Sequence, residues 1–212
     1  MNLSQDIVLQ YITHVSGERD EIAGAEGALN GGCRWIQLRM KEASDEQFCI
    51  IGEKLGALCR EYGATFILDD RAHLVKRLKA DGVHLGKNDM PLEEARELLG
   101  PDMIIGATAN TVEEALNAVY RKADYVGVGP FRYTTTKKNL SAILGVEGLR
   151  NMMKQVREVS DIPVVGIGGI KTADIAEIML TGVSGIALSG EILNADDPVE
   201  TTKRIIEILH NV

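Results

Sequence analysis

The chain alternates between short apolar runs and longer segments whose apolar residues recur every three or four positions. The short runs are rich in β-branched residues and show little polar alternation, which is typical of strands buried on both faces. In the longer segments, residues such as Phe48, Ile51 and Leu55 would share one face of a helix. We expect eight strands, over residues 7–13, 34–38, 65–69, 82–85, 103–107, 124–128, 162–167 and 183–188.

Capping signatures mark where three of the helices between these strands should begin. A residue that can accept a hydrogen bond from the helix N-terminus stands three positions before a glutamate or glutamine in each case. These helix starts are Ser44 with Gln47, Thr111 with Glu114, and Asp197 with Pro198 and Glu200.

Eight alternating strand–helix units predict a parallel sheet that closes into a (β/α)₈ barrel, the TIM barrel fold. We expect one domain over residues 1–212. The alternative is a doubly wound open sheet, which usually has fewer strands. In a barrel of this kind, the chemistry takes place at the carboxyl ends of the strands.

Composition narrows the class of partner. The 31 acidic residues outnumber the 23 basic ones, for a net charge of −8, which disfavours nucleic acid and anionic membranes as partners. The longest apolar stretch, 162–170, is far shorter than the roughly 20 residues of a membrane span. We expect no secretion signal in the first ten residues, and three cysteines without metal-like spacing indicate a cytoplasmic protein with reduced thiols. Assembly of the chain into a homo-oligomer stays an open possibility.

The end of the second predicted strand carries two cations. Gln37, Arg39 and Lys41 alternate along the chain and would project to one side. Arginine as a planar fork and lysine as a point charge suit a phosphate or pyrophosphate. The alternative is a solvated strand edge.

Acidic residues follow the next two strands. Asp69 and Asp70 end the third strand, and Asp89 follows the fourth. Carboxylates at neighbouring strand ends could share a Mg²⁺ ion, which also takes water and phosphate oxygens as ligands. The alternatives are a helix N-cap for Asp70 and a turn residue for Asp89. Within the fourth strand, His84 is expected to be a packed, hydrogen-bonded histidine rather than a base.

Later strand ends add further anion-binding features. Thr108 places a hydroxyl after the fifth strand, and the longest loop, 131–145, contains three threonines and two lysines. Glycines after the seventh and eighth strands would let backbone N–H groups approach a phosphate. The alternatives are a solvated loop and tight turns. Two anion sites predict a pair of phosphorylated small-molecule substrates, with pyrophosphate as leaving group.

The strand ends resemble those of the thiamine-phosphate synthase family, also called thiamine-phosphate pyrophosphorylase. The likeness covers almost the whole chain. Its motifs are Gln-Leu-Arg-Met-Lys at 37–41, the acids at 69–70, Gly-Val-His-Leu-Gly-Lys-Asn-Asp at 82–89, Tyr-Val-Gly-Val-Gly-Pro at 125–130, Thr-Thr-Thr-Lys-Lys at 134–138 and Pro-Val-Val-Gly-Ile-Gly-Gly-Ile at 163–170.

The resemblance implies a transferase of thiamine biosynthesis with a (β/α)₈ barrel. It would couple 4-amino-2-methyl-5-(diphosphooxymethyl)pyrimidine with 4-methyl-5-(2-phosphooxyethyl)thiazole, giving thiamine phosphate and pyrophosphate. The reaction would depend on Mg²⁺ and pass through a pyrimidine-methyl cation, so no nucleophile or general base would be needed.

Roles carried over by position follow the same resemblance. The pyrimidine diphosphate would meet Gln37, Leu38, Arg39, Met40, Lys41, Asp69, Thr108 and Lys137. The thiazole phosphate would meet Thr134, Thr135, Thr136, Gly169, Ser189 and Gly190. Asp70 and Asp89 would hold Mg²⁺, and the leaving pyrophosphate would be stabilised by Arg39, Lys41 and Lys137.

Three positions depart from the family pattern. Asp69 stands where asparagine is usual, Thr108 where serine is usual, and Ser189-Gly190 where Val-Ser is usual. Asp69 adds negative charge beside a diphosphate, which keeps two alternatives open. These are a relative that acts as a thiazole tautomerase and a non-catalytic binder of thiamine precursors. A Schiff-base aldolase would require an uncharged Lys41, which a neighbouring Arg39 disfavours.

Overall fold

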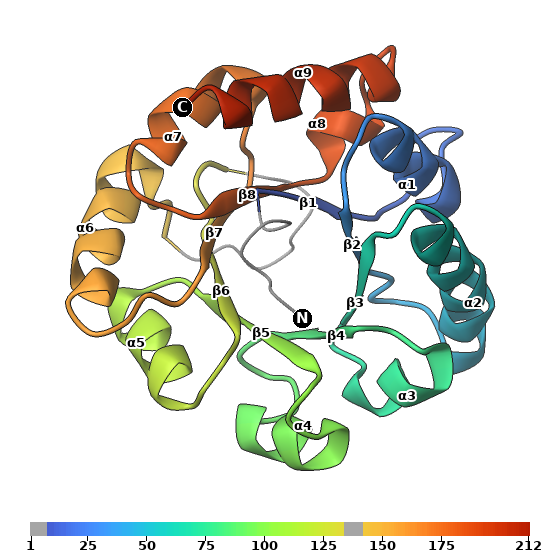
Figure 1. Cartoon of the computed structure of the whole chain (residues 1–212), viewed down its shortest axis with the longest axis horizontal. Helices are drawn as coiled ribbons and strands as arrows, with labels where there is room; N and C mark the ends of the chain where they lie inside the picture. Colours follow the sequence, from blue (N-terminus) through green and yellow to red (C-terminus); the bar gives the residue numbers. More distant parts are fainter. Residues whose placement is uncertain (1–7, 134–141) are drawn as a thin grey trace.

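A computed structural model describes residues 8–133 and 142–212. Eight parallel strands form a closed barrel in which each strand is hydrogen-bonded to its neighbours in sequence, and β8 returns to β1. This confirms the (β/α)₈ barrel (Figure 1). The strands are β1 (Leu9–Ile12), β2 (Trp35–Leu38), β3 (Thr65–Asp69), β4 (Gly82–Leu85), β5 (Ile104–Ala109), β6 (Tyr125–Val128), β7 (Val164–Ile167) and β8 (Gly185–Leu188).

Helices surround the barrel in chain order, as the colour sequence of Figure 1 shows. They are α1 (Glu21–Asn30), α2 (Asp45–Glu61), η1 (Ala72–Leu74), α3 (Val75–Leu78), α4 (Leu92–Leu99), α5 (Val112–Tyr120), α6 (Gly145–Arg157), η2 (Thr172–Asp174), α7 (Ile175–Met179), α8 (Gly190–Leu193) and α9 (Pro198–His210). The sequence pattern did not predict α8, because four residues are too few to show helical periodicity.

Helix starts follow the capping prediction in two cases and differ in one. Ser44 and Gln47 form a reciprocal capping box, and the Asp197 carboxylate accepts from the backbone N–H of Glu200. Thr111 caps α5, but the Glu114 carboxylate accepts from the N–H of Asn110 rather than from the cap residue. The strand boundaries agree with prediction within two residues. β5 extends to Ala109 because its end pairs with β6, so Thr108 lies within the strand.

Apolar side chains fill the interior of the barrel. Trp35 and Tyr125 meet edge to face there, with ring centroids 4.8 Å apart. Gly106 makes room for Tyr125, because a Cβ at this position would lie 2.2 Å from the Tyr125 ring. A second and larger core lies between the barrel and its helices. Since the interior is packed, a ligand can reach the strands only at an end of the barrel.

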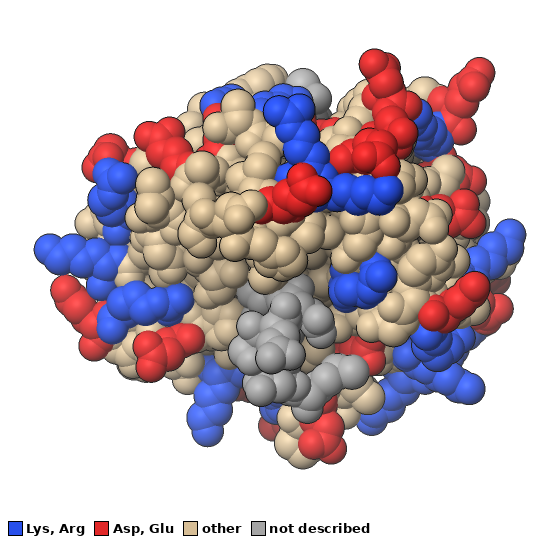
Figure 2. Space-filling view, turned by 45° about the horizontal axis from the view of Figure 1, so that its top comes forward, with Lys and Arg blue, Asp and Glu red and all other residues tan. Residues whose placement is uncertain are grey.

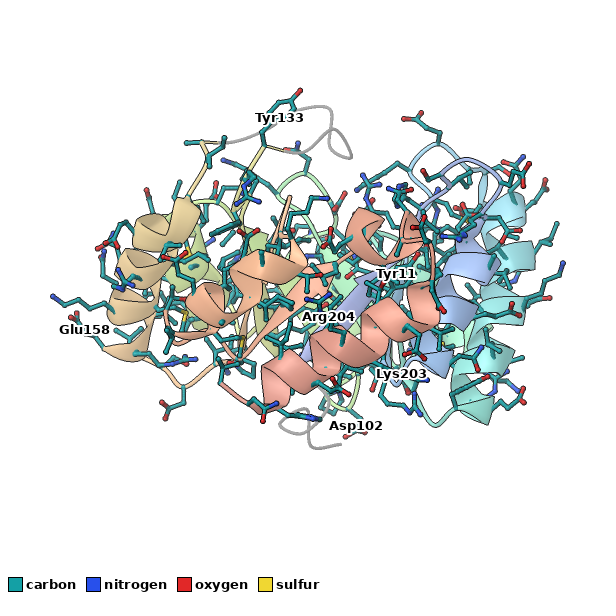
Figure 3. The ribbon with its side chains drawn as sticks, turned by 90° about the horizontal axis from the view of Figure 1, so that it is seen from above. Tyr11, Asp102, Tyr133, Glu158, Lys203 and Arg204 are labelled. Carbon is teal, nitrogen blue, oxygen red and sulfur yellow. The ribbon has the colours of Figure 1, made fainter. Side chains whose placement is uncertain are left out.

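The two ends of the barrel are identified in Figure 3. Tyr133, on the loop after β6, lies at the end where the strands finish, and Asp102, just before β5, lies at the opposite end. On the face drawn in Figure 2, acidic and basic side chains of the described residues are interspersed. Among the residues that the structure describes, no helix has the length and apolar character needed to cross a bilayer.

Candidate active site

Asp69, at the end of β3, is the centre of a charged cluster. Gln37 Nε2 donates to Asp69 Oδ1 at 2.7 Å. Lys41 Nζ lies 3.3 Å and Arg39 Nε 3.6 Å from Asp69 Oδ2. These three residues alternate along the end of β2, which is hydrogen-bonded to β3, so their side chains reach the same carboxylate. The structure therefore brings Gln37, Arg39 and Lys41 together, as predicted.

Two further carboxylates continue this cluster toward β4. Lys41 also pairs with Asp70, and the carboxyl groups of Asp70 and Asp89 lie within hydrogen-bonding reach of each other. Asp70 has a φ of 65°, a left-handed backbone conformation that aspartate adopts more readily than most residues. The sequence offered a structural alternative for each of these two aspartates, and the structure supports only one of them. No side chain caps η1, so Asp70 is not its N-cap, whereas Asp89 does close a turn by accepting from Gly86 N at 2.6 Å.

Among the described residues, charge is unbalanced in the cluster, because two cations face three carboxylates. Burial raises the pKa of Asp69, and the nearby Lys41 and Arg39 offset only part of that effect. Burial and the adjacent Asp70 also raise the pKa of Asp89. For Lys41, burial opposes the charge, but the carboxylates outweigh it and raise the pKa. The cluster as it stands would repel a diphosphate unless a further cation joined it.

The acidic pair suits a hard divalent cation, the class to which Mg²⁺ belongs. Within residues 8–133 and 142–212, no group of three or more His, Cys, Asp or Glu side chains is arranged to hold a metal. Asp70 and Asp89 would therefore supply two oxygen ligands and leave the remaining positions to water and phosphate. Mg²⁺ prefers such a mixture, because it gives up its water reluctantly and binds phosphate oxygens. The donor set fits the magnesium prediction.

Leu38 and Met40 differ from their neighbours on β2. The Leu38 side chain is fully buried in the core between barrel and helices, and Met40 packs against that core. Alternation along the strand places them on the opposite side from Gln37 and Arg39. Only the backbone of Leu38 is therefore available to a substrate at the mouth of the barrel.

Thr108 belongs to a hydrogen-bonded chain inside the barrel. Its hydroxyl lies 2.9 Å from His84 Nε2, and His84 Nδ1 lies 2.9 Å from the Tyr125 hydroxyl. His84 is 8% exposed, so it is the packed, hydrogen-bonded histidine that the sequence predicts. These contacts hold the Thr108 hydroxyl against His84, near the carboxyl end of β5.

The β7 side of the mouth is built from backbone. Gly168 and Gly169 have φ values of 97° and 71°, which favour glycine. A Cβ at Gly169 would lie 2.8 Å from the Tyr133 carbonyl oxygen. The backbone N–H of Arg132, which precedes Tyr133, donates to Gly168 O at 2.8 Å. The Arg132 guanidinium donates two hydrogen bonds to the Asp174 carboxylate, at 2.7 and 2.8 Å. The start of the β6–α6 loop is thus held against the turn after β7.

Ser189 precedes the short helix α8, which begins at Gly190. Its hydroxyl donates to Ile12 O at 2.6 Å and lies 2.7 Å from His14 Nδ1. A serine hydroxyl has one proton, and here the Ile12 carbonyl accepts it. In this arrangement Ser189 has no side-chain proton to give a phosphate, so its contribution would come from the backbone.

Two residues of the mouth were missed from the sequence, His14 after β1 and Arg132 after β6. His14 is half-buried, and burial, followed by the nearby Arg39 guanidinium, lowers its pKa. A polar residue at the end of the first strand was the available signal for His14. Arg132 had none, since its partner Asp174 is 42 positions away. The predicted residues Thr134, Thr135, Thr136 and Lys137 lie outside the described residues.

Comparisons with known proteins agree with one another. Residues 9–192 match the family model described as Thiamine monophosphate synthase. Thiamine-phosphate synthase from Bacteroides fragilis is 55% identical over 201 residues, covering 94% of this chain and 98% of that protein. The enzyme of the same name from Pyrococcus horikoshii is 41% identical over 212 residues, covering 100% and 99%.

Structural similarity leads to the same family. The solved thiamine phosphate pyrophosphorylase from Pyrococcus furiosus superimposes with a TM-score of 0.87 at 38% identity, covering 99% of this chain and 98% of that one. The matched region includes both halves of the barrel mouth. This confirms the expectation of a transferase, and the chain belongs to the thiamine monophosphate synthase family.

Proposed function

We propose that this protein makes thiamine phosphate by joining the aminopyrimidine diphosphate to the thiazole phosphate, with release of pyrophosphate and a requirement for Mg²⁺. The observation that carries the proposal is the convergence of Arg39 and Lys41 with the acidic pair Asp70 and Asp89 at one side of the barrel mouth. Family membership supports the overall reaction.

The charged cluster would act on the leaving group. As the bond between the pyrimidine methylene and the diphosphate breaks, negative charge grows on the departing oxygen. Arg39 and Lys41 would stabilise that charge, which is the kind of interaction that contributes most to catalysis. Thr108, oriented by His84, would donate a further hydrogen bond. When bound at Asp70 and Asp89, Mg²⁺ would supply charge neutralisation of the diphosphate.

The opposite side of the mouth would hold the thiazole phosphate. The turn at Gly168 and Gly169 and the backbone at Ser189 and Gly190 offer close approach without side-chain obstruction. The attacking atom is the thiazole ring nitrogen, which uses its lone pair and carries no proton. The reaction as proposed therefore needs no general base, only two subsites that bring carbon and nitrogen together.

The test is one incubation with both substrates and Mg²⁺, followed by mass spectrometry. Equal amounts of thiamine phosphate and pyrophosphate are expected, only with both substrates and only with metal. Controls omit one substrate or contain EDTA. Product formed at an unchanged rate in EDTA would reject the metal requirement.

The same incubation separates the alternative functions. Thermal protection by both substrates without any product would replace the proposal with a binding function. Conversion of a thiazole phosphate tautomer in the absence of the pyrimidine would replace it with a tautomerase.

Location and partners belong to the same proposal. We propose a cytoplasmic protein that acts on small molecules and not on nucleic acid. The three cysteines, Cys33, Cys49 and Cys59, are free and buried, which supports a reducing compartment. The acidic net charge of −8 supports the absence of a nucleic-acid partner. A homo-oligomer remains a prediction, which light scattering of the purified protein would test.

A further inference from the structure

His14 lies between the two halves of the barrel mouth. It follows β1, which is hydrogen-bonded to β8 on one side and to β2 on the other. Its Nδ1 contacts Ser189 at the end of β8 at 2.7 Å, and the Arg39 guanidinium at the end of β2 is near enough to act on its charge. His14 therefore stands where the two proposed subsites meet.

Hydrogen bonding assigns the imidazole protons. The single proton of the Ser189 hydroxyl goes to Ile12 O, so toward His14 the hydroxyl oxygen can only accept. Nδ1 of His14 must then carry a proton. A neutral imidazole has one N–H, which leaves Nε2 with a lone pair as an acceptor. Nε2 has no hydrogen-bond partner among residues 8–133 and 142–212.

The neutral form is the one that the surroundings favour. Burial and then the Arg39 guanidinium lower the pKa of His14. An acceptor nitrogen at the junction is therefore matched to a neutral donor on a substrate rather than to a phosphate.

This inference rests on the proposed function. The two substrates of that reaction provide one such donor. The exocyclic amino group of the pyrimidine is the one N–H donor that either substrate carries. It is attached to the ring carbon next to the one that bears the reacting methylene. Because the methylene must meet the thiazole nitrogen between the two subsites, the amino group must also lie there.

We propose that Nε2 of His14 accepts a hydrogen bond from the amino group of the pyrimidine and so makes this residue a determinant of substrate specificity. No proton is transferred. The carbon–oxygen bond breaks with its electron pair leaving on pyrophosphate, and the thiazole nitrogen supplies the pair for the new carbon–nitrogen bond. A hydrogen bond to the amino group increases its electron release into the ring, which favours the developing cation.

Two substitutions distinguish the role of Nδ1 of His14 from the role of Nε2. In His14→Asn the amide nitrogen takes the place of Nδ1 and keeps the Ser189 contact, but nothing replaces Nε2. In His14→Gln the amide oxygen reaches the place of Nε2. His73→Asn is the matched control, because His73 is an exposed histidine paired with Asp45. Thermal melting of each variant would establish that it is folded.

The readout is binding of two pyrimidine diphosphates, one with the amino group and one with hydrogen in its place, with Mg²⁺ and without thiazole phosphate. The parent and the His73→Asn control should prefer the amino compound by about tenfold, as one neutral hydrogen bond provides. His14→Gln should retain most of the preference, and His14→Asn should lose it. An unchanged preference in His14→Asn would overturn the inference.

Binding also keeps this inference separate from the proposed function. A parent that discriminates between the two pyrimidines but forms no thiamine phosphate, with the preference lost in His14→Asn, would reject the reaction and support the role of His14. If the parent forms product and His14→Asn still discriminates as well as the parent, the reaction is supported and the role of His14 is rejected.

Discussion

The two halves of the barrel mouth, proposed to hold the two phosphorylated substrates, are built from different chemical groups. At β2, β3 and β4, five charged side chains form one connected cluster, in which Asp69 is buried. At β7 and β8, the turn uses Gly168 and Gly169, and Ser189 has its hydroxyl proton engaged by Ile12. One half relies on side-chain charge and the other on the shape of the backbone.

The difference matches what happens to each phosphate in the proposed reaction. The diphosphate becomes a leaving group, so charge develops on it and must be stabilised in the transition state. The thiazole phosphate does not react, and fixed dipoles that hold it in place are sufficient. Substitutions that change charge should therefore affect the kinetic constants most in the first half. Substitutions that add atoms should affect them most in the second half.

The largest effect is expected from Lys41→Met, which removes a cation from the charged half. We expect kcat/KM to fall by about 10²–10³-fold, since the leaving group loses a stabilising charge. Steady-state kinetics at saturating Mg²⁺ would measure it. The control is Lys203→Met, on the outer helix α9, where the lysine pairs with Glu200 (Figure 3). Activity within threefold of the parent in Lys41→Met would contradict the assignment.

Gly169→Ala tests the backbone half. The added Cβ would lie 2.8 Å from Tyr133 O and 2.9 Å from Arg132 O, at a φ of 71°. We expect KM for the thiazole phosphate to rise about tenfold while KM for the diphosphate stays nearly constant, with a loss of stability of about 1–3 kcal/mol.

Gly182→Ala provides the comparison for that variant. Its φ of 92° imposes similar backbone strain, but no atom of residues 8–133 and 142–212 lies within 4 Å of the added Cβ. It should lose stability without changing either KM. Equal effects of the two alanines on KM would mean that the turn after β7 does not position the thiazole phosphate.

Asp69→Asn sharpens the comparison by leaving the charged half with equal numbers of cations and carboxylates. An asparagine carbonyl can still accept from Gln37 Nε2, now 2.7 Å from Asp69 Oδ1. We expect KM for the diphosphate to fall by about threefold, because one repulsive carboxylate is gone. Kinetics with varied diphosphate would measure this. A tenfold loss of kcat would instead show that the Asp69 carboxylate takes part in the reaction.

The smallest effect is expected from Asp174→Asn, which releases the guanidinium of Arg132. Melting temperature near neutral pH should fall by at most about 2 °C, because the arginine side chain is 48% exposed and solvent screens the ion pair. Burial opposes ionisation of Asp174, but its hydrogen bonds to Arg132 and to the Lys171 N–H lower its pKa on balance.

The sign of that shift fixes the pH dependence. A carboxylate whose folded pKa is lowered adds stability above its unfolded pKa of about 3.9, and loses it as the pH falls through the folded value. The difference between the parent and Asp174→Asn should therefore be constant from about pH 5 to pH 8 and disappear in stronger acid. A difference that grows on acidification would contradict the ion pair.

Local patterns in the sequence were sufficient for the barrel and for part of the site. Strands and helices follow from apolar periodicity, and Gln37, Arg39 and Lys41 share a side because strand residues alternate. Neighbouring parallel strands end at one edge, which is why Asp70 and Asp89 were expected to meet. These inferences depend only on residues that are close together in the sequence or that end consecutive strands.

Tertiary structure alone decided the contacts that depend on barrel closure and on loop packing. His14 meets Ser189 across 175 positions because β8 closes onto β1, and Arg132 meets Asp174 across 42 because two loops pack together. Which polar atom receives the one proton of Ser189, and how deeply Asp69 is buried among its cations, also depend on three-dimensional packing. Spacing along a chain specifies periodicity and neighbouring strands, but a hydrogen bond requires a distance and a direction that only the folded chain provides.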